Sequence, residues 1–190
     1  MTTSYARRLA DTALGQCDKY HFFSEDDPPL ANQISKYWND LDMHFPGVGT
    51  AWSAVFVSWC AKKAGAVVAE FPFSARHATY IQAFIRNAVQ EAGLFRAFPL
   101  DVYGPAVGDL IQNNRGGNNY DYEFARTHAA YESHTAIVVE TGEDSLGRYA
   151  MTVGGNESDS VRRKVVRLSA SGKVRQRPTN PYICVVQCLK

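Results

Sequence analysis

Residues 50–60 read Thr50-Ala51-Trp52-Ser53-Ala54-Val55-Phe56-Val57-Ser58-Trp59-Cys60 (TAWSAVFVSWC), and this stretch decides the expected fold. Its apolar residues recur at helical spacing and predict a helix over residues 52–64, which ends at Gly65. Glycine suits the left-handed conformation that follows many helices. Four large apolar side chains form a stripe that we expect to be buried against a sheet: Trp52, Val55, Phe56 and Trp59.

The same stretch contains three side chains that could act as nucleophiles. Ser53 falls in the first helical turn, where unpaired N–H groups and the helix dipole favour a developing negative charge. The ordinary interpretation is that Ser53, or Thr50 just before it, only caps the helix. Cys60 lies two turns further along, which is more typical of a small buried hydrophobe than of a reactive thiol. Ser58 lies inside the helix, away from its first turn.

Outside this helix, the sequence predicts further helices before residue 93 and mainly strands after it. Apolar spacings of three and four predict further helices over residues 5–19, 30–41 and 77–92. A strand-rich half begins near residues 107–111, and alternating segments predict strands over residues 135–140, 149–153, 161–168 and 182–189. Helices followed by an antiparallel sheet indicate an α+β protein, with residues 1–190 forming a single domain.

A long polar and aromatic segment, residues 113–131 (NNRGGNNYDYEFARTHAAY), interrupts the strand-rich half. Loops of this length are either disordered or fold over a functional site. The sequence leaves both interpretations open.

Composition excludes several classes of function. The formal net charge of +1 gives no electrostatic basis for binding nucleic acid or an acidic membrane surface. No stretch approaches the roughly 20 apolar residues that span a bilayer, and the N-terminus lacks the apolar core of a signal peptide. Four scattered cysteines and the lack of paired Cys or His spacings argue against a disulfide scaffold or a zinc site. We therefore expect no metal and no cofactor.

Three residues downstream have the chemistry to assist a nucleophile. His134 precedes the alternating strand TAIVVE, and His77 begins a helix after FPFSAR. Asn156 follows Gly154-Gly155, which is strong turn chemistry, so a hairpin turn is the ordinary interpretation. The functional alternative is a side chain that orients a histidine, as in a nucleophile–base–orienter set. No one of these signals decides the question.

Several segments of the sequence resemble, in their order along the chain, the motifs of a known family. TAWSAVFVSWCAKKAG is similar to the signature of the CHAP amidases, in which a helix reading W-C-A-A-F-V-S-W-C ends in Lys-Ala-Gly. PAVGDLI, SHTAIVVE and VGGNESDSV then resemble that family's P-x-x-G-D-L strand, G-H-x-x-I-V strand and E-G-N turn, over about residues 30–165. WSAVFVSW, FPFSARHATYI, VGDLI and VGGN resemble still more closely an uncharacterised bacterial domain family related to CHAP and NlpC-type papain-like hydrolases.

The resemblance implies a papain-like fold with N-terminal helices packed on an antiparallel sheet. It implies Ser53 as nucleophile, His134 as base and Asn156 as orienter, while Cys60 aligns with a second, structural cysteine. Two departures stand out: Ser53 replaces the catalytic cysteine, and Gly154 or Gly155 replaces the glutamate of the turn. A cysteine ionises beside a histidine, whereas a serine must lose its proton during attack, so a serine site needs close geometry.

The implied function is a peptidoglycan-directed amide hydrolase, an amidase or stem-peptide endopeptidase, such as a phage lysin or a delivered antibacterial effector. Its partners would be peptidoglycan or a related glycopeptide, and an immunity or delivery protein. It would be made in the cytoplasm without a signal peptide and act in the periplasm or cell wall. The residues expected to contact substrate are Trp52, His77, Tyr80 and Arg115. The alternatives are a catalytically inactive cell-wall or glycan-binding module, and a papain-like deamidase or acyltransferase acting on another substrate.

Overall fold

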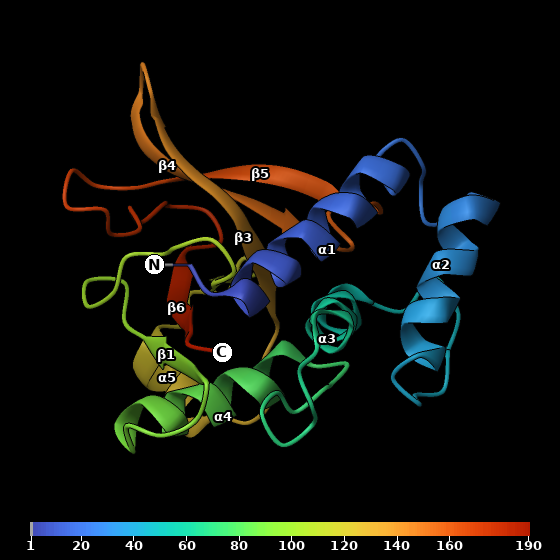
Figure 1. Cartoon of the computed structure of the whole chain (residues 1–190), viewed down its shortest axis with the longest axis horizontal. Coiled ribbons are helices and arrows are strands. Elements are labelled where there is room, and N and C mark those ends of the chain that lie inside the picture. Colours follow the sequence, from blue (N-terminus) through green and yellow to red (C-terminus); the bar gives the residue numbers. More distant parts are fainter. Residues whose placement is uncertain (1) are drawn as a thin grey trace.

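The computed structural model describes residues 2–190, and these residues form five helices and a six-stranded antiparallel sheet (Figure 1). The helices are α1 (Ser4–Tyr20), α2 (Pro28–Asn39), α3 (Ser53–Ala64), α4 (His77–Val89) and α5 (Tyr122–Thr127). The strands are β1 (Phe95–Phe98), β2 (Leu110–Asn114), β3 (Ser133–Asp144), β4 (Gly147–Gly154), β5 (Arg162–Arg167) and β6 (Tyr182–Cys188). Their order in the sheet is β1-β6-β2-β3-β4-β5. The predicted α+β class is confirmed.

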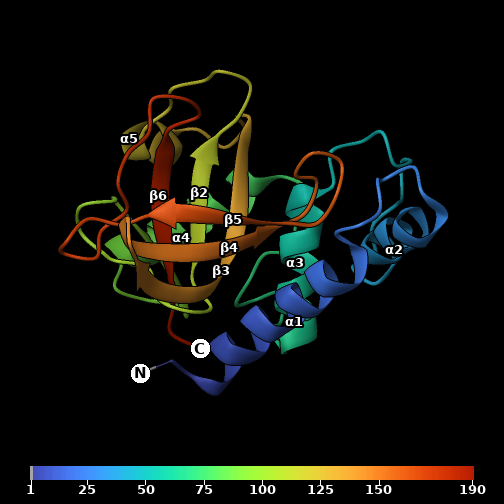
Figure 2. The same cartoon turned by 90° about the horizontal axis from the view of Figure 1, so that it is seen from above.

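Helix α3 forms where the sequence predicts it and ends at Gly65, whose φ of 109° is left-handed. Ten of its twelve residues are buried, so the helix is covered on more than the one predicted stripe. It contacts α1 and α2 on one side and strands β3 and β4 on the other. Figure 2 shows α3 beside the sheet, with α1 crossing it and α2 on its far side. Helix α3 therefore lies between the other two N-terminal helices and the sheet.

Helix α2 begins two residues earlier than predicted, at Pro28. Proline is favoured in the first helical turn because its missing N–H would have no partner there. Strand β1 was not predicted, because four residues are too few to show an alternating pattern. It pairs with β6 and closes one edge of the sheet.

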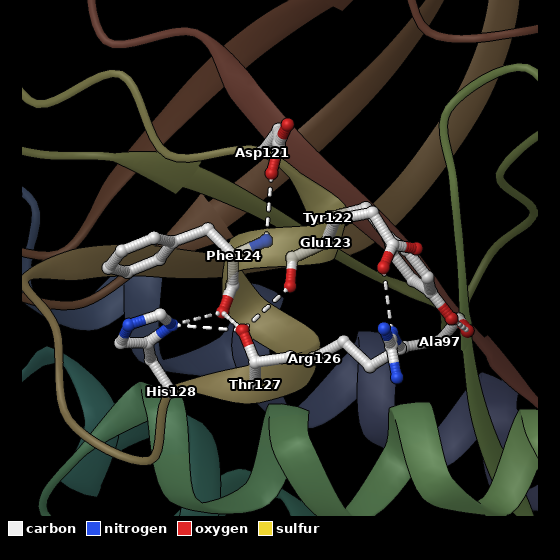
Figure 3. Close-up of polar contacts among 8 residues, drawn as sticks. All are labelled: Ala97, Asp121, Tyr122, Glu123, Phe124, Arg126, Thr127 and His128. Atoms are coloured by element: carbon white, nitrogen blue, oxygen red, sulfur yellow. Dashed lines mark hydrogen bonds and ion pairs between the residues drawn. The ribbon is translucent and has the colours of Figure 1, made fainter.

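The segment 113–131 is ordered and contains α5, a single short helix that the sequence did not predict (Figure 3). The Asp121 side chain caps α5 by accepting from the N–H of Phe124 at 2.8 Å. The Tyr122 hydroxyl donates to the carbonyl of Ala97 in β1 at 3.0 Å. Because α5 packs on α4 and β6, the segment lies on the folded core, as one of the two interpretations expected.

No helix within residues 2–190 combines the length and apolar character needed to cross a bilayer.

Candidate functional site

Ser53 is the first residue of α3, and its hydroxyl lies 2.7 Å from His77 Nε2. Ser53 is not the helix cap: Trp52 holds that position and makes no capping hydrogen bond through its side chain. The capping interpretation of Ser53 and of Thr50 is therefore wrong. The Ser53 side chain is instead held by a histidine from another helix.

His77 is the first residue of α4, and its second ring nitrogen, Nδ1, lies 2.5 Å from the Tyr80 hydroxyl. The two residues lie three apart and so share one helix face. Burial, reinforced by the neighbouring His134 and Arg115, lowers the pKa of His77 well below its ordinary value. His77 is therefore a neutral imidazole at neutral pH, with one N–H and one free lone pair.

The Tyr80 hydroxyl is compatible with the tautomer of His77 that a base requires. Tyr80 is fully buried, and burial raises the pKa of its hydroxyl far above the ordinary value, so the hydroxyl keeps its proton. In the tautomer that carries its proton on Nδ1, His77 donates to the Tyr80 oxygen. His77 Nε2 then carries the lone pair that faces Ser53.

His134, the second residue of β3, belongs to a separate buried group. Its Nε2 lies 2.8 Å from Glu157 Oε1, and Glu157 also pairs with Lys164. Burial alone would raise the pKa of Glu157, but its contacts with His134 and Lys164 lower it below the ordinary value. Glu157 is therefore ionised although only 4% of it is exposed.

The turn that carries Glu157 has an unusual backbone. Asn156, Ser158 and Asp159 all have φ between 52° and 55°, and Glu157 lies between them. Left-handed conformations cost energy in residues other than glycine and concentrate at functional sites. The turn is closed by a hydrogen bond from Glu157 N to the carbonyl of Ser160 at 2.9 Å. Because of this backbone conformation, the Glu157 carboxylate lies next to Gly154 at the end of β4 and contacts His134.

The two buried groups touch through their histidines. The His77 and His134 rings lie edge to face, with centroids 5.5 Å apart. Within residues 2–190 His134 makes no hydrogen bond to Ser53, whose only side-chain partner is His77. The expected Ser53–His134 hydrogen bond is therefore replaced by a Ser53–His77 hydrogen bond, with His134 directly behind.

Asn156 does not orient His134, because Glu157 occupies that position. With its amide oxygen turned toward Trp52, Asn156 accepts from the backbone N–H at 3.3 Å and from the indole Nε1 at 3.2 Å. The indole also donates to Glu25 at 2.8 Å. Asn156 thus ties the turn to the residue before Ser53. The sequence predicted Asn156 as the partner of His134, whereas the actual partner is the next residue, Glu157.

The structure also corrects two of the expected substrate contacts. Trp52 and Tyr80 are both fully buried, so neither side chain is available to a substrate. Tyr80 instead positions His77, and Trp52 packs in the core. Arg115 is exposed, as a substrate-binding residue should be. Cys60 is also fully buried, and burial raises the pKa of its thiol well above the ordinary value, as expected of an inert cysteine.

Two open pockets reach the two groups. A pocket of about 470 Å³ is lined by Ser53 and His77 together with Arg76, Arg115 and Glu132. A second pocket, also about 470 Å³, is lined by His134 and Glu157 and likewise by Arg115. Arg115 therefore stands where the two pockets meet. The described residues contain no group of three or more His, Cys, Asp and Glu side chains that could hold a metal.

Comparison with known proteins gives one match. The sequence model of a family described as an uncharacterized protein conserved in bacteria (DUF2272) matches residues 25–184. No curated protein and no solved structure gives a match. The matched range contains both buried groups, from Ser53 to Lys164.

Proposed function

We propose that this chain, which belongs to the bacterial DUF2272 family, is an amide hydrolase of papain-like fold in which Ser53 is the nucleophile. The observation that carries the proposal is the 2.7 Å contact between Ser53 Oγ and the neutral His77. It joins a hydroxyl at the first turn of a buried helix to an imidazole lone pair. The papain-like assignment is supported by that helix, which contacts strand β3 of an antiparallel sheet and whose first residue, Ser53, lines one pocket together with Ser133 of β3.

His77 would act as the general base. As Ser53 Oγ attacks the amide carbon, its proton passes to His77 Nε2, and the carbonyl electrons move to the oxygen. The N–H groups of the first turn of α3, which have no partner within the helix, would stabilise this oxyanion. His77 then returns the proton to the leaving amine as the C–N bond breaks. Water hydrolyses the remaining ester by the same steps and releases Ser53.

His134 and Glu157 would stabilise the charge that forms on His77. The ionised Glu157 accepts from His134 Nε2–H, which fixes that ring and leaves its Nδ1 free. The negative charge then lies one imidazole away from His77, which becomes positive during the reaction. The roles expected from the resemblance change in two respects: His77 would be the base with His134 in support, and Glu157 takes the place expected for Asn156.

We further propose peptidoglycan as the substrate, cut at an amide of the stem peptide. The support for this substrate is the resemblance to CHAP and NlpC-type hydrolases, together with the two pockets that share Arg115, which would accommodate an extended chain. Action on this polymer requires that the protein reach the periplasm or cell wall.

The burial of Ser53 favours a second candidate, an inactive wall-binding module. Only 2% of Ser53 is exposed, which leaves little room for an attacking geometry without movement of the pocket. In this case Ser53 marks the place of a lost thiol. The module would bind wall polymers without cutting them.

One experiment separates the two candidates. Purified peptidoglycan is digested with the wild type, Ser53→Ala and Ser53→Cys, and soluble products are identified by mass spectrometry. The control is Ser58→Ala, which removes a second buried hydroxyl of α3 that bonds only to the backbone of Ser74. The hydrolase proposal expects new amine termini from the wild type and Ser58→Ala but none from Ser53→Ala. Products from Ser53→Cys alone would identify a disarmed hydrolase.

A further inference from the structure

The pocket beside His134 is unusually rich in cations. Its lining contains Arg115, Lys164 and Arg177, and its one carboxylate is Glu157. The negative charge of Glu157 is already paired with Lys164. The pocket therefore keeps positive charge, from Arg115 and Arg177, that no ion pair among the described residues balances.

Two of these cations have no acidic partner in the described part of the chain. Neither Arg115 nor Arg177 forms an ion pair there, whereas Lys164 in the same pocket pairs with Glu157. An unpaired guanidinium that faces a pocket is suited to a carboxylate, which it binds with two parallel hydrogen bonds.

Arg177 is held in place by two contacts that leave it free to bind an anion. Its Nε donates to the carbonyl of Asn180 at 2.9 Å, and the guanidinium lies 4.4 Å from the centre of the Tyr182 ring. Stacking on an aromatic ring fixes the plane of the guanidinium without using its two terminal nitrogens. Arg177 is thus ordered before any ligand binds, which reduces the entropy lost on binding.

Arg115 connects this pocket to the nucleophile. It lines both pockets, and its positive charge is near enough to His77 to lower the pKa of that histidine. A ligand that contacts Arg115 from the cationic pocket therefore lies next to the pocket that contains Ser53. The two pockets can serve one substrate.

We propose that the cationic pocket is a subsite for a substrate carboxylate, and that the preferred substrates are peptides with a free carboxylate close to the scissile amide. Arg115 and Arg177 would bind the carboxylate, and Lys164 would remain with Glu157. A bound carboxylate would also offset the Arg115 charge beside His77, which favours proton transfer from Ser53. The inference rests on the proposed amide hydrolysis for its substrate but not for its binding chemistry.

The test uses muropeptides released from purified walls, with their carboxyl groups either left free or converted to carboxamides. Hydrolysis of both forms is measured with the wild type, Arg115→Gln, Arg177→Gln and the control Arg175→Gln, which lies outside both pockets. We expect the two pocket variants to raise KM for the free form by about ten-fold or more, with a smaller change for the carboxamide form. Arg175→Gln should match the wild type.

Binding of the same two ligands to Ser53→Ala, measured by calorimetry, separates this inference from the proposed function. Preferential binding of the free form without any hydrolysis by the wild type supports the subsite and rejects the hydrolase. Hydrolysis of both forms at equal kcat/KM, with equal binding, overturns the subsite and leaves the hydrolase in place. Loss of binding in Arg175→Gln equal to that in Arg177→Gln would also overturn it, because the effect would then be general charge attraction.

Discussion

His77 and His134 have touching rings and similar burial, yet their surroundings are opposite. Among the described residues His77 shares hydrogen bonds with two hydroxyl groups, Ser53 and Tyr80, and with no carboxylate. His134 contacts the ionised Glu157. Burial and neutral hydrogen-bond partners keep His77 unprotonated, which suits a base, whereas His134 lies against a negative charge. Environment, more than residue type, divides the roles of base and supporting residue.

The largest effect should come from removing the base. We expect His77→Ala to lower kcat by about a thousand-fold or more, because Ser53 then has no acceptor for its proton. Tyr80→Phe, which removes only the hydroxyl at His77 Nδ1, should lower kcat less and leave KM unchanged. Both values come from steady-state hydrolysis of peptidoglycan fragments. If His134→Ala is severely impaired while His77→Ala keeps wild-type kcat, the roles of the two histidines are the reverse.

The next effect should come from neutralising Glu157. Glu157→Gln keeps the size of the side chain but removes the negative charge behind His77, and we expect kcat to fall by about a hundred-fold. The matched control is Glu123→Gln on α5, an exposed carboxylate that pairs only with Arg126. The control should retain full activity. Equal kcat in Glu157→Gln and the wild type would show that the His134 group takes no part in the reaction.

A smaller effect should follow from separating His134 and Glu157 without changing either. A methyl group on Gly154 would overlap Glu157 Oε1 and lie 2.7 Å from His134 Nε2. We expect Gly154→Ala to lower kcat by about ten-fold and to destabilise the fold by about 1–3 kcal/mol. Gly15→Ala is the control, since nothing lies within 4 Å of its added methyl in α1, and it should be fully active. Thermal melts and kcat are measured on both.

Asp109 should affect stability alone, as a buried carboxyl whose hydrogen bonds come from neutral groups. Burial, only partly opposed by hydrogen bonds from Cys188 N, Ala106 N and Tyr103, raises its pKa from 3.8 to about 6. The folded state therefore favours the protonated form, and this stabilisation is complete below about pH 4 and lost as pH rises through 6. A shift of two pKa units corresponds to about 3 kcal/mol.

The measurement is chemical denaturation at pH 4, 5, 6 and 7 for the wild type and Asp109→Asn. The difference in unfolding free energy between them should change across this range, while kcat/KM changes in parallel for both. A constant difference would mean that Asp109 titrates normally, and that burial alone does not perturb a carboxyl here as it perturbs His77.

The sequence predicts the scaffold of the site better than its contacts. Helix α3 was predictable because its apolar run is continuous and Gly65 terminates it. The Ser53–His77 contact was not predictable, because it joins the first residues of two separate helices. Residue spacing within a helix does not indicate how two helices approach each other. Glu157 was missed because its contact with His134 depends on left-handed residues in the turn, which the sequence does not reveal. Asn156 drew attention instead, because asparagine is common in turns. The short elements α5 and β1 were missed because periodicity needs length.

The central claim is that Ser53 is a nucleophile activated by His77, and covalent labelling tests it most directly. The wild type, His77→Ala and Ser53→Ala are incubated with a fluorophosphonate, which reacts with activated serine hydroxyls by loss of fluoride, and the adduct is located by peptide mass spectrometry. We predict one adduct on Ser53 in the wild type, a much slower reaction in His77→Ala and none in Ser53→Ala. An unlabelled Ser53 in the wild type, or labelling in His77→Ala at the wild-type rate, would contradict the account.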